Sequence, residues 1–235
     1  MSIIISFIFL LTLSSATKLN RTEENSDVLE SWIKLDKTLK GTTQSVIKYL
    51  MPMLVESSSQ VNLSSKCVKQ SLQLVTGLRS LKKWAFSFVD SSAKGFDGLL
   101  SGALSSFGEY DQCLEINVFD RKKKDEVVFQ GQYCMVQLRL PLPPKTKRYR
   151  LYDQLEELKN FSGTEVMKYL SQRAHLMYYI PIKVGLCIPS GCSEDDLQNI
   201  LNFAVKKFEM NAQVSYCEVK EEKQFYWIQI FAMYV

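Results

Sequence analysis

Hydrophobic side chains recur at helical spacing along the first part of the chain. They form a stripe that indicates a helix beginning near Asp27, a residue type that caps helices. The stripe contains Leu29, Trp32, Ile33, Leu39, Val46, Ile47 and Leu50. Gly41 and the two threonines after it interrupt the stripe, and proline at position 52 disfavours a helix interior. We therefore expect two helical pieces that end at Pro52.

Later segments show the same helical spacing. The most regular of them follows Ser193, where three acidic residues fill the first turn and complement the helix dipole. Residues 81–89 hold three aromatic side chains and fit a helix or a strand equally well. Other helices are expected after Ser64 or Ser65, which can cap a helix containing Cys67, and over residues 149–158 and 164–177.

The middle of the chain changes to an alternating pattern that is typical of strands. Strands are expected over residues 113–119, 127–129 and 133–140, with a charged turn at 121–125 and Gly131 between the last two. Pro181 makes 178–188 an edge or irregular strand. Residues 213–219 form a last strand, while the glycine-rich stretch 90–112 is irregular. The pattern predicts an α+β fold, mainly helical with a small antiparallel sheet.

Composition narrows the class of protein further. The chain has 235 residues, of which 46% are hydrophobic and 23% charged, enough for one globular domain with its own core or for two small ones. A net charge of +4 is too small to indicate a nucleic-acid partner. His175 is the single histidine, which argues against a histidine-rich metal site and against most histidine-dependent catalysis.

The N-terminus indicates a secretory protein. Residues 3–13 form an apolar run that is too short to span a bilayer. Ser14 and Ala16 suit the positions before a signal-peptidase site, so residues 1–16 are interpreted as a signal peptide cleaved before Thr17. We expect a secreted or extracellular domain, or one in the lumen of the secretory pathway.

In that compartment the cysteines should form disulfides. They are Cys67, Cys113, Cys134, Cys187, Cys192 and Cys217. Six cysteines allow 15 pairings, and the sequence does not choose among them. Cys113 and Cys134 lie on strands expected to be adjacent, so this pair is favoured. Cys187 and Cys192 could pair with each other or reach Cys67 and Cys217.

Glycosylation sequons accompany the signal peptide. The three acceptor positions are Asn20, Asn62 and Asn160, and each would carry a glycan where it is exposed.

The C-terminal residues 225–235 form an apolar, aromatic run. As a helix they would extend about 16 Å, roughly half of a bilayer core. The run could be a buried strand, or the first half of a transmembrane helix lost by truncation or alternative splicing. In the second case it would bring the domain into contact with a membrane.

Four stretches together resemble the extracellular N-terminal domain of nose-resistant-to-fluoxetine proteins, which occur in nematodes and insects. They are the helix around Cys67; Trp84–Asp90 with Lys94 and Gly98–Gly102; Gly108–Leu114 with Gly131–Cys134; and Gly185–Ser193 with the helix that follows and Cys217. The family usually has a Lys-x-Pro-x-Gly motif where this chain has Lys94-Gly95-Phe96-Asp97-Gly98, so the second stretch departs from the pattern.

The resemblance implies a domain over residues 17–224 that precedes a multi-pass, acyltransferase-like membrane domain in typical members. Because that domain is absent here, we expect no catalytic residues, no cofactor and no metal. The family's association with transport of lipids and hydrophobic compounds implies a lipid or another hydrophobic molecule as a ligand. The alternative is a protein-interaction or regulatory ectodomain that acts on a membrane partner. A pocket of several hundred Å³ would favour the first hypothesis, and a filled core the second.

Weak catalytic patterns are also present. Ser80 with Lys83 and Ser91 with Lys94 match a Ser-x-x-Lys nucleophile pattern, which chance explains better because its companion motifs are missing. A serine or cysteine within hydrogen-bond reach of His175 would favour an enzyme instead.

Overall fold

The computed structural model describes residues 25–95, 98–120, 126–145 and 154–221. The predicted signal peptide, Asn20 and the apolar run 225–235 lie outside these residues. The helices are α2 (Asn25–Gln60), α3 (Ser65–Arg79), α4 (Lys83–Ser91), α5 (Tyr110–Leu114), α6 (Glu165–Arg173) and α7 (Glu194–Lys206). The strands are β1 (Ser105–Ser106), β2 (Asn117–Phe119), β3 (Val127–Arg139), β4 (Ile182–Pro189) and β5 (Asn211–Val219). Short 3-10 turns occur at Leu99–Ser101, Glu156–Leu158 and Ala174–Tyr178.

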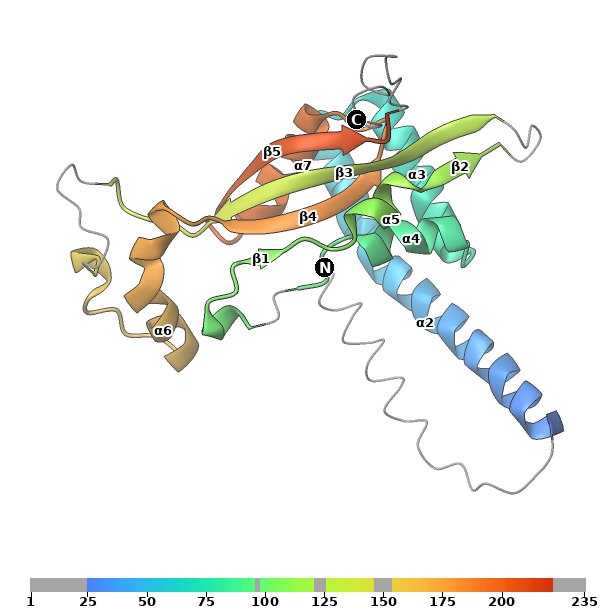
Figure 1. The fold of residues 1–235 in the computed structure, drawn as a ribbon, viewed down its shortest axis with the longest axis horizontal. Helices are drawn as coiled ribbons and strands as arrows, with labels where there is room; N and C mark the ends of the chain where they lie inside the picture. Colours follow the sequence, from blue (N-terminus) through green and yellow to red (C-terminus); the bar gives the residue numbers. More distant parts are fainter. Residues whose placement is uncertain (1–24, 96–97, 121–125, 146–153, 222–235) are drawn as a thin grey trace, which may run out of the picture.

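Strand β3 is the centre of the sheet (Figure 1). It pairs antiparallel with β4 on one side, while its other side pairs first with β2 and then with β5. Strand β1 adds a two-residue parallel pairing to β4, which makes the sheet mixed. The predicted α+β fold is confirmed, with three disulfides joining its elements.

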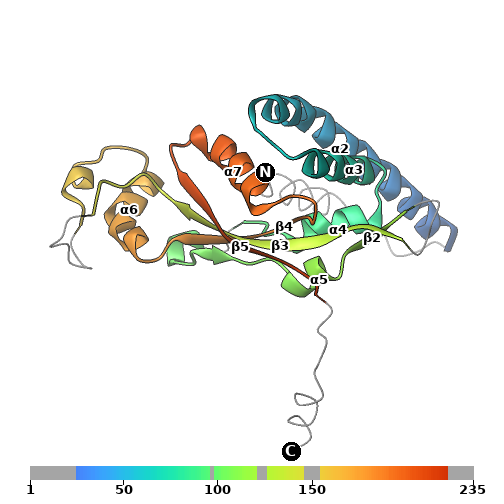
Figure 2. The same ribbon diagram turned by 90° about the horizontal axis from the view of Figure 1, so that it is seen from above.

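The alternation of side chains along β3 divides the interior into two clusters. Phe129, Tyr133 and Met135 point to one face, where they pack with Phe88 of α4 and Cys113 of α5. Cys134, Val136 and Leu138 point to the other face, against Leu197 and Leu201 of α7. Figure 2 shows α7 on one side of the sheet and α5 on the other.

The expected break at Gly131 is wrong, because β3 is one continuous strand. A Cβ atom at this position would lie 2.0 Å from the carbonyl oxygen of Cys113. The glycine therefore permits close contact with α5 and does not mark a turn. The prediction of a strand over 113–119 is also corrected, since its first part is α5 and β2 begins only at Asn117.

The expected division of the first helix is wrong as well. Helix α2 continues through Gly41 and Pro52 to Gln60. Near Gly41 the hydroxyls of Thr38, Thr42 and Ser45 each donate to the carbonyl four residues earlier, which satisfies them within the helix. Pro52 removes one helical hydrogen bond, but Pro52 and Lys48 are exposed, so water can solvate the carbonyl that is left without its donor.

The remaining segments differ less from expectation. Residues 81–89 belong mostly to helix α4. The segment 164–177 is α6 followed by a 3-10 turn, and the described part of 149–158 contains only the turn at Glu156–Leu158. Strand β4 starts just after Pro181. The prediction that Ser64 and Ser193 cap helices is confirmed for both residues.

Candidate functional site

Three disulfides connect elements that are distant in the sequence. Cys67 of α3 pairs with Cys192 before α7, Cys113 of α5 with Cys187 of β4, and Cys134 of β3 with Cys217 of β5. The expected Cys113–Cys134 pair is therefore wrong. Cys134 lies in the cluster under α7, while Cys113 lies in the cluster on the opposite face of the sheet. Their sulfur atoms are therefore on opposite sides of β3 and cannot bond to each other.

The glycines of the family-like motifs lie at points of close approach. A Cβ on Gly185 would be 2.1 Å from the Phe107 carbonyl oxygen, and one on Gly191 would be 2.4 Å from Gln70 Oε1. The buried Gln70 side chain accepts a hydrogen bond of 2.7 Å from the Gly191 backbone N–H. These motifs thus build the frame of the domain, which explains their spacing without a catalytic role.

One buried carboxylate joins the starts of two helices. Asp196, in the first turn of α7, accepts hydrogen bonds from the backbone and hydroxyl of Ser193 and from those of Ser64, the cap of α3. Burial by itself would raise the pKa of Asp196, but these hydrogen bonds outweigh it and lower the pKa below 3.8. The acidic first turn of α7 is therefore a structural feature in which Asp196 is charged at neutral pH.

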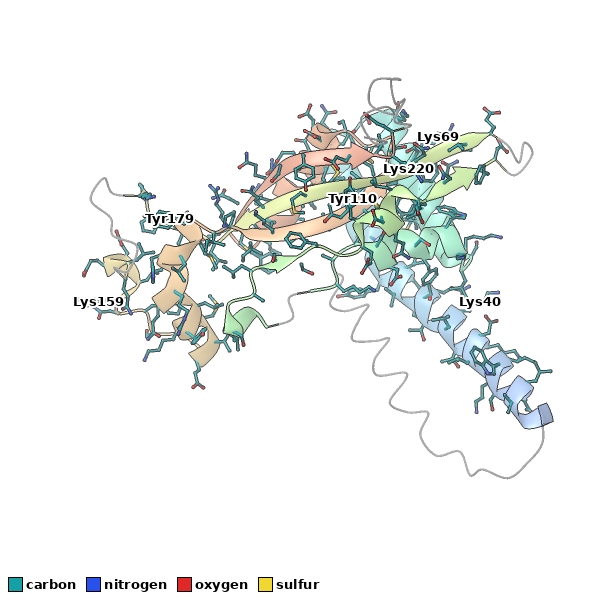
Figure 3. All side chains as sticks on the ribbon, viewed as in Figure 1. Lys40, Lys69, Tyr110, Lys159, Tyr179 and Lys220 are labelled. Carbon is teal, nitrogen blue, oxygen red and sulfur yellow. A yellow bond between two sulfur atoms is a disulfide. The ribbon has the colours of Figure 1, made fainter. Side chains whose placement is uncertain are left out.

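Tyrosines cluster on the sheet face that carries α5. The rings of Tyr110 and Tyr133 meet edge to face at 4.9 Å, and the Tyr133 hydroxyl donates to the Phe107 carbonyl at 2.8 Å. Tyr110, labelled in Figure 3, donates to Glu218 Oε2 at 2.5 Å, and this bond raises the pKa of Tyr110 to about 12. Both phenols keep their protons at neutral pH, so neither can act as a base there. Sequence reasoning missed this cluster because its members come from separate segments.

The two side chains of the Ser91–Lys94 pattern have other partners. The Ser91 side chain is buried and its hydroxyl donates at 2.6 Å to the Ser87 carbonyl, while Lys94 forms an ion pair with Asp90 at 2.5 Å. His175 Nδ1 is buried without a hydrogen-bond partner among the described residues. In the same part of the chain, no three histidine, cysteine or acidic side chains are grouped so that they could hold a metal ion.

Two of the three sequon positions are described by the structure. Asn62 lies in the loop between α2 and α3, and Asn160 follows the 3-10 turn at Glu156–Leu158; both are exposed. Glycosylation of Asn20, Asn62 and Asn160 stays a prediction.

The most unusual surface is the first half of α2, which extends away from the rest of the domain (Figure 1). Every residue from Val28 to Gly41 is exposed. Its apolar side chains are Val28, Leu29, Trp32, Ile33, Leu35 and Leu39, with Trp32 67% exposed. We call these six residues the α2 face. Large apolar surfaces on monomeric soluble proteins usually mark interaction sites, so the α2 face is the candidate site.

The hollows near α2 are open to solvent. One of about 460 Å³ is lined by polar residues of α2 together with Arg79, Ser80 and Leu81. Another, of about 600 Å³, is lined more by apolar surface from Ser45, Lys48, Tyr49 and Pro52. The sequence stripe indicated the apolar side of α2, but it could not tell that the first half would remain uncovered.

Within the described part of the chain, no helix has both the length and the apolar character needed to cross a bilayer.

Comparison with known proteins agrees with the sequence motifs. Residues 67–201 match the family model "Nose resistant-to-fluoxetine protein, N-terminal domain". The chain is 24% identical over 140 residues to Nose resistant to fluoxetine protein 6 of Caenorhabditis elegans, an alignment that covers 56% of this chain and 16% of that protein. No solved structure matches. The matched region contains five of the six cysteines and strands β1 to β4 of the sheet, while β5 with Cys217 follows it. The chain therefore belongs to the nose-resistant-to-fluoxetine family, through the N-terminal domain that characterises it.

Proposed function

We propose that this chain is an extracellular, non-catalytic module that works by binding another protein through the α2 face. The observation that carries the proposal is the exposure of six large apolar side chains on the first half of α2, which the other described residues leave uncovered. An isolated helix of this length is only marginally stable in water, so a partner that covers the apolar side would stabilise it.

The disulfides support the extracellular part of the proposal. Three bridges that link distant elements persist in an oxidising compartment and are rare in the cytosol. They make the body of the domain a rigid support from which α2 extends. Such a support suits a binding module, because only α2, and not the body of the domain, then loses conformational entropy when the surface is covered.

Packing inside the domain also favours protein binding over enclosure of a ligand. The two hydrophobic clusters are filled by side chains on both faces of the sheet. The larger hollows described above lie outside them, along α2, where a small hydrophobic molecule would remain largely exposed to water.

Binding of a lipid or another hydrophobic molecule is the second candidate function. The hollow beside Tyr49 and Pro52 favours it, because its lining is mainly apolar and its volume of about 600 Å³ falls in the range of small-molecule sites. Tyr49 is 75% exposed and could cover part of such a ligand.

Binding to cells separates these functions. Labelled protein purified from culture medium is titrated onto cells that express a full-length member of the same family, and onto cells that lack it. We expect saturable binding that requires the family member and is lost in the double variant Trp32→Ser/Leu35→Ser. The matched control is Lys34→Ser/Lys37→Ser, which alters exposed polar positions of the same helix segment.

The second candidate is tested on the same preparation. Native mass spectrometry, followed by denaturation, would reveal a bound lipid as a mass that is released. A released lipid that is lost in Tyr49→Ser, together with cell binding that is the same in all variants, would replace the protein-binding proposal by the lipid-binding one.

A further inference from the structure

Helix α2 is much longer than the helix that packs beside it. Its 36 residues extend over about 54 Å, while the 15 residues of α3 extend over about 22 Å. The two helices contact each other and are joined by the short loop 61–64, so α3 can cover only the C-terminal part of α2. By these lengths about 30 Å of α2 continues beyond α3. Figures 1 and 2 both show α2 extending past α3.

The apolar stripe on α2 has the spacing of a coiled-coil seam. The seam positions follow one another at alternating intervals of four and three residues. They are Val28, Trp32, Leu35, Leu39, Thr42, Val46 and Tyr49. In the second half of the helix, Thr42 and Val46 of this seam are half-buried, whereas Tyr49 at its end is exposed. In the first half the same seam is uncovered. The α2 face therefore continues a seam that is partly covered within the domain, and its spacing suits another helix.

We propose that the occupant is a second copy of this chain, whose α2 pairs antiparallel with the first about a two-fold axis between residues 33 and 34. This inference rests on the proposed function and names the partner of the same surface. In this register Trp32 faces the partner's Leu35, and Val28 faces the partner's Leu39. One apolar segment is thus complementary to itself, as a two-fold interface requires.

The distribution of charge favours the antiparallel direction. Residues 28–33 carry Glu30 as their one charged residue, whereas residues 34–40 carry Lys34, Lys37 and Lys40 with Asp36. A parallel pair would place three lysines of each copy at the same level along the seam. The antiparallel pair places each lysine-rich half beside the half that contains Glu30, which reduces the repulsion. Because the spacing puts Glu30, Lys34 and Lys37 away from the seam, these charges bias the direction and contribute little to the affinity.

The position of the body favours the same direction. The domain lies at the C-terminal end of α2 (Figure 1). A parallel pair would bring two bodies to one end of the seam, where they compete for space. An antiparallel pair puts them at opposite ends and leaves the whole segment from Val28 to Leu39 free to pair.

Sedimentation equilibrium of the full chain over a range of concentrations tests the pairing. We expect a reversible monomer–dimer equilibrium whose dissociation constant rises at least tenfold in Trp32→Ser/Leu35→Ser and stays within threefold in the control Lys34→Ser/Lys37→Ser. Leu35→Lys is a second variant with the same expectation, for use if the double variant does not fold by circular dichroism.

Cross-linking tests the direction. With a short amine-reactive reagent, an antiparallel pair should give a Lys34–Lys34 link between copies. It should give no Lys40–Lys40 link, because the two Lys40 residues would be about 20 Å apart along the axis. A parallel pair would give both links and would overturn the proposed direction.

Other outcomes separate this inference from the proposed function. A wild-type chain that stays monomeric at all concentrations overturns the inference. If such a monomer still loses cell binding in Trp32→Ser/Leu35→Ser, the proposed function stands with a different protein as the partner. A monomer that binds phosphatidylserine vesicles through the α2 face identifies a membrane as the occupant instead. A dimer that is unchanged in both α2 variants uses another surface and also overturns the inference.

Discussion

Ser64 and Asp196, 132 residues apart in the sequence, are joined by two hydrogen bonds of 2.7 Å, one from the Ser64 backbone N–H and one from its hydroxyl. Ser193 adds two further bonds to Oδ2 of the same carboxylate, at 2.9 and 3.0 Å. One buried charge therefore fixes the starts of α3 and α7 next to the Cys67–Cys192 disulfide, which joins the same two places. The relative position of the two helices depends on both connections.

Asp196→Ala should destabilise the domain strongly. It removes the acceptor for four hydrogen bonds, two from Ser64 and two from Ser193, and replaces a buried charged side chain by a methyl group. Since a hydrogen bond to a charged group contributes roughly 1.5–3 kcal/mol, we expect the free energy of unfolding to fall by about 2–4 kcal/mol. Urea denaturation followed by circular dichroism measures this change.

Asp195→Ala is the matched control. Asp195 lies in the same helical turn but is exposed, so its removal should cost less than about 1 kcal/mol. Equal losses in the two variants would mean that the charge of the first turn matters and the buried hydrogen bonds do not.

The same carboxylate predicts how stability depends on pH. The pKa of Asp196 in the folded state is lowered from 3.8, so its contribution is complete above this pH and is lost as the pH falls through the lower, folded-state pKa. The difference in unfolding free energy between wild type and Asp196→Asn should therefore be constant from about pH 5 to 8 and shrink below about pH 4. A difference that shrank on raising the pH instead would contradict the lowered pKa.

The sequence was sufficient for features that depend on neighbouring residues. The caps at Ser64 and Ser193 were predictable because each serine precedes a helical pattern, and Ser193 is followed by acidic residues. The role of Asp196 was not predictable, because its second serine comes from the other end of the chain. The disulfide pairing was missed for the same kind of reason. The face to which a cysteine points is set by strand register and by helix α5, which the alternating pattern of 113–119 concealed.

Gly131→Ala should destabilise the domain although alanine is a small residue. The added methyl group would lie 2.0 Å from the Cys113 carbonyl oxygen and 3.2 Å from Ile116 Cβ, so α5 must move away from β3. Overpacking of this kind costs roughly 1–3 kcal/mol. Thermal unfolding followed by circular dichroism should give a lower Tm, and a Tm equal to that of wild type would show that α5 can shift without cost.

Gly41→Ala should have the opposite effect. Gly41 is an exposed position within α2, and an added Cβ would meet no atom within 4 Å. Alanine is favoured over glycine in a helix interior by about 0.5–1 kcal/mol. We expect greater helicity at 222 nm and slower amide hydrogen exchange over residues 34–45, with no loss of stability. Faster exchange there would mean that α2 is bent at Gly41 in solution.

The disulfide arrangement predicts which peptides are linked. Digestion without reduction, followed by mass spectrometry, should give the pairs Cys67–Cys192, Cys113–Cys187 and Cys134–Cys217. The two cysteines of each bridge are 125, 74 and 83 residues apart, so each bridge closes a long loop, and the loss of any one should cost about 2–5 kcal/mol.

Cys134→Ser/Cys217→Ser should be the most readily tolerated of these losses. The two cysteines are directly opposite each other on β3 and β5, and the hydrogen bonds of the antiparallel pair still hold the strands together. Cys67→Ser/Cys192→Ser should cost more, since the contact between Ser64 and Asp196 would then lose the covalent bond beside it. A Cys113–Cys134 peptide in the digest would contradict the observed strand register, and equal losses in the two double variants would contradict this order.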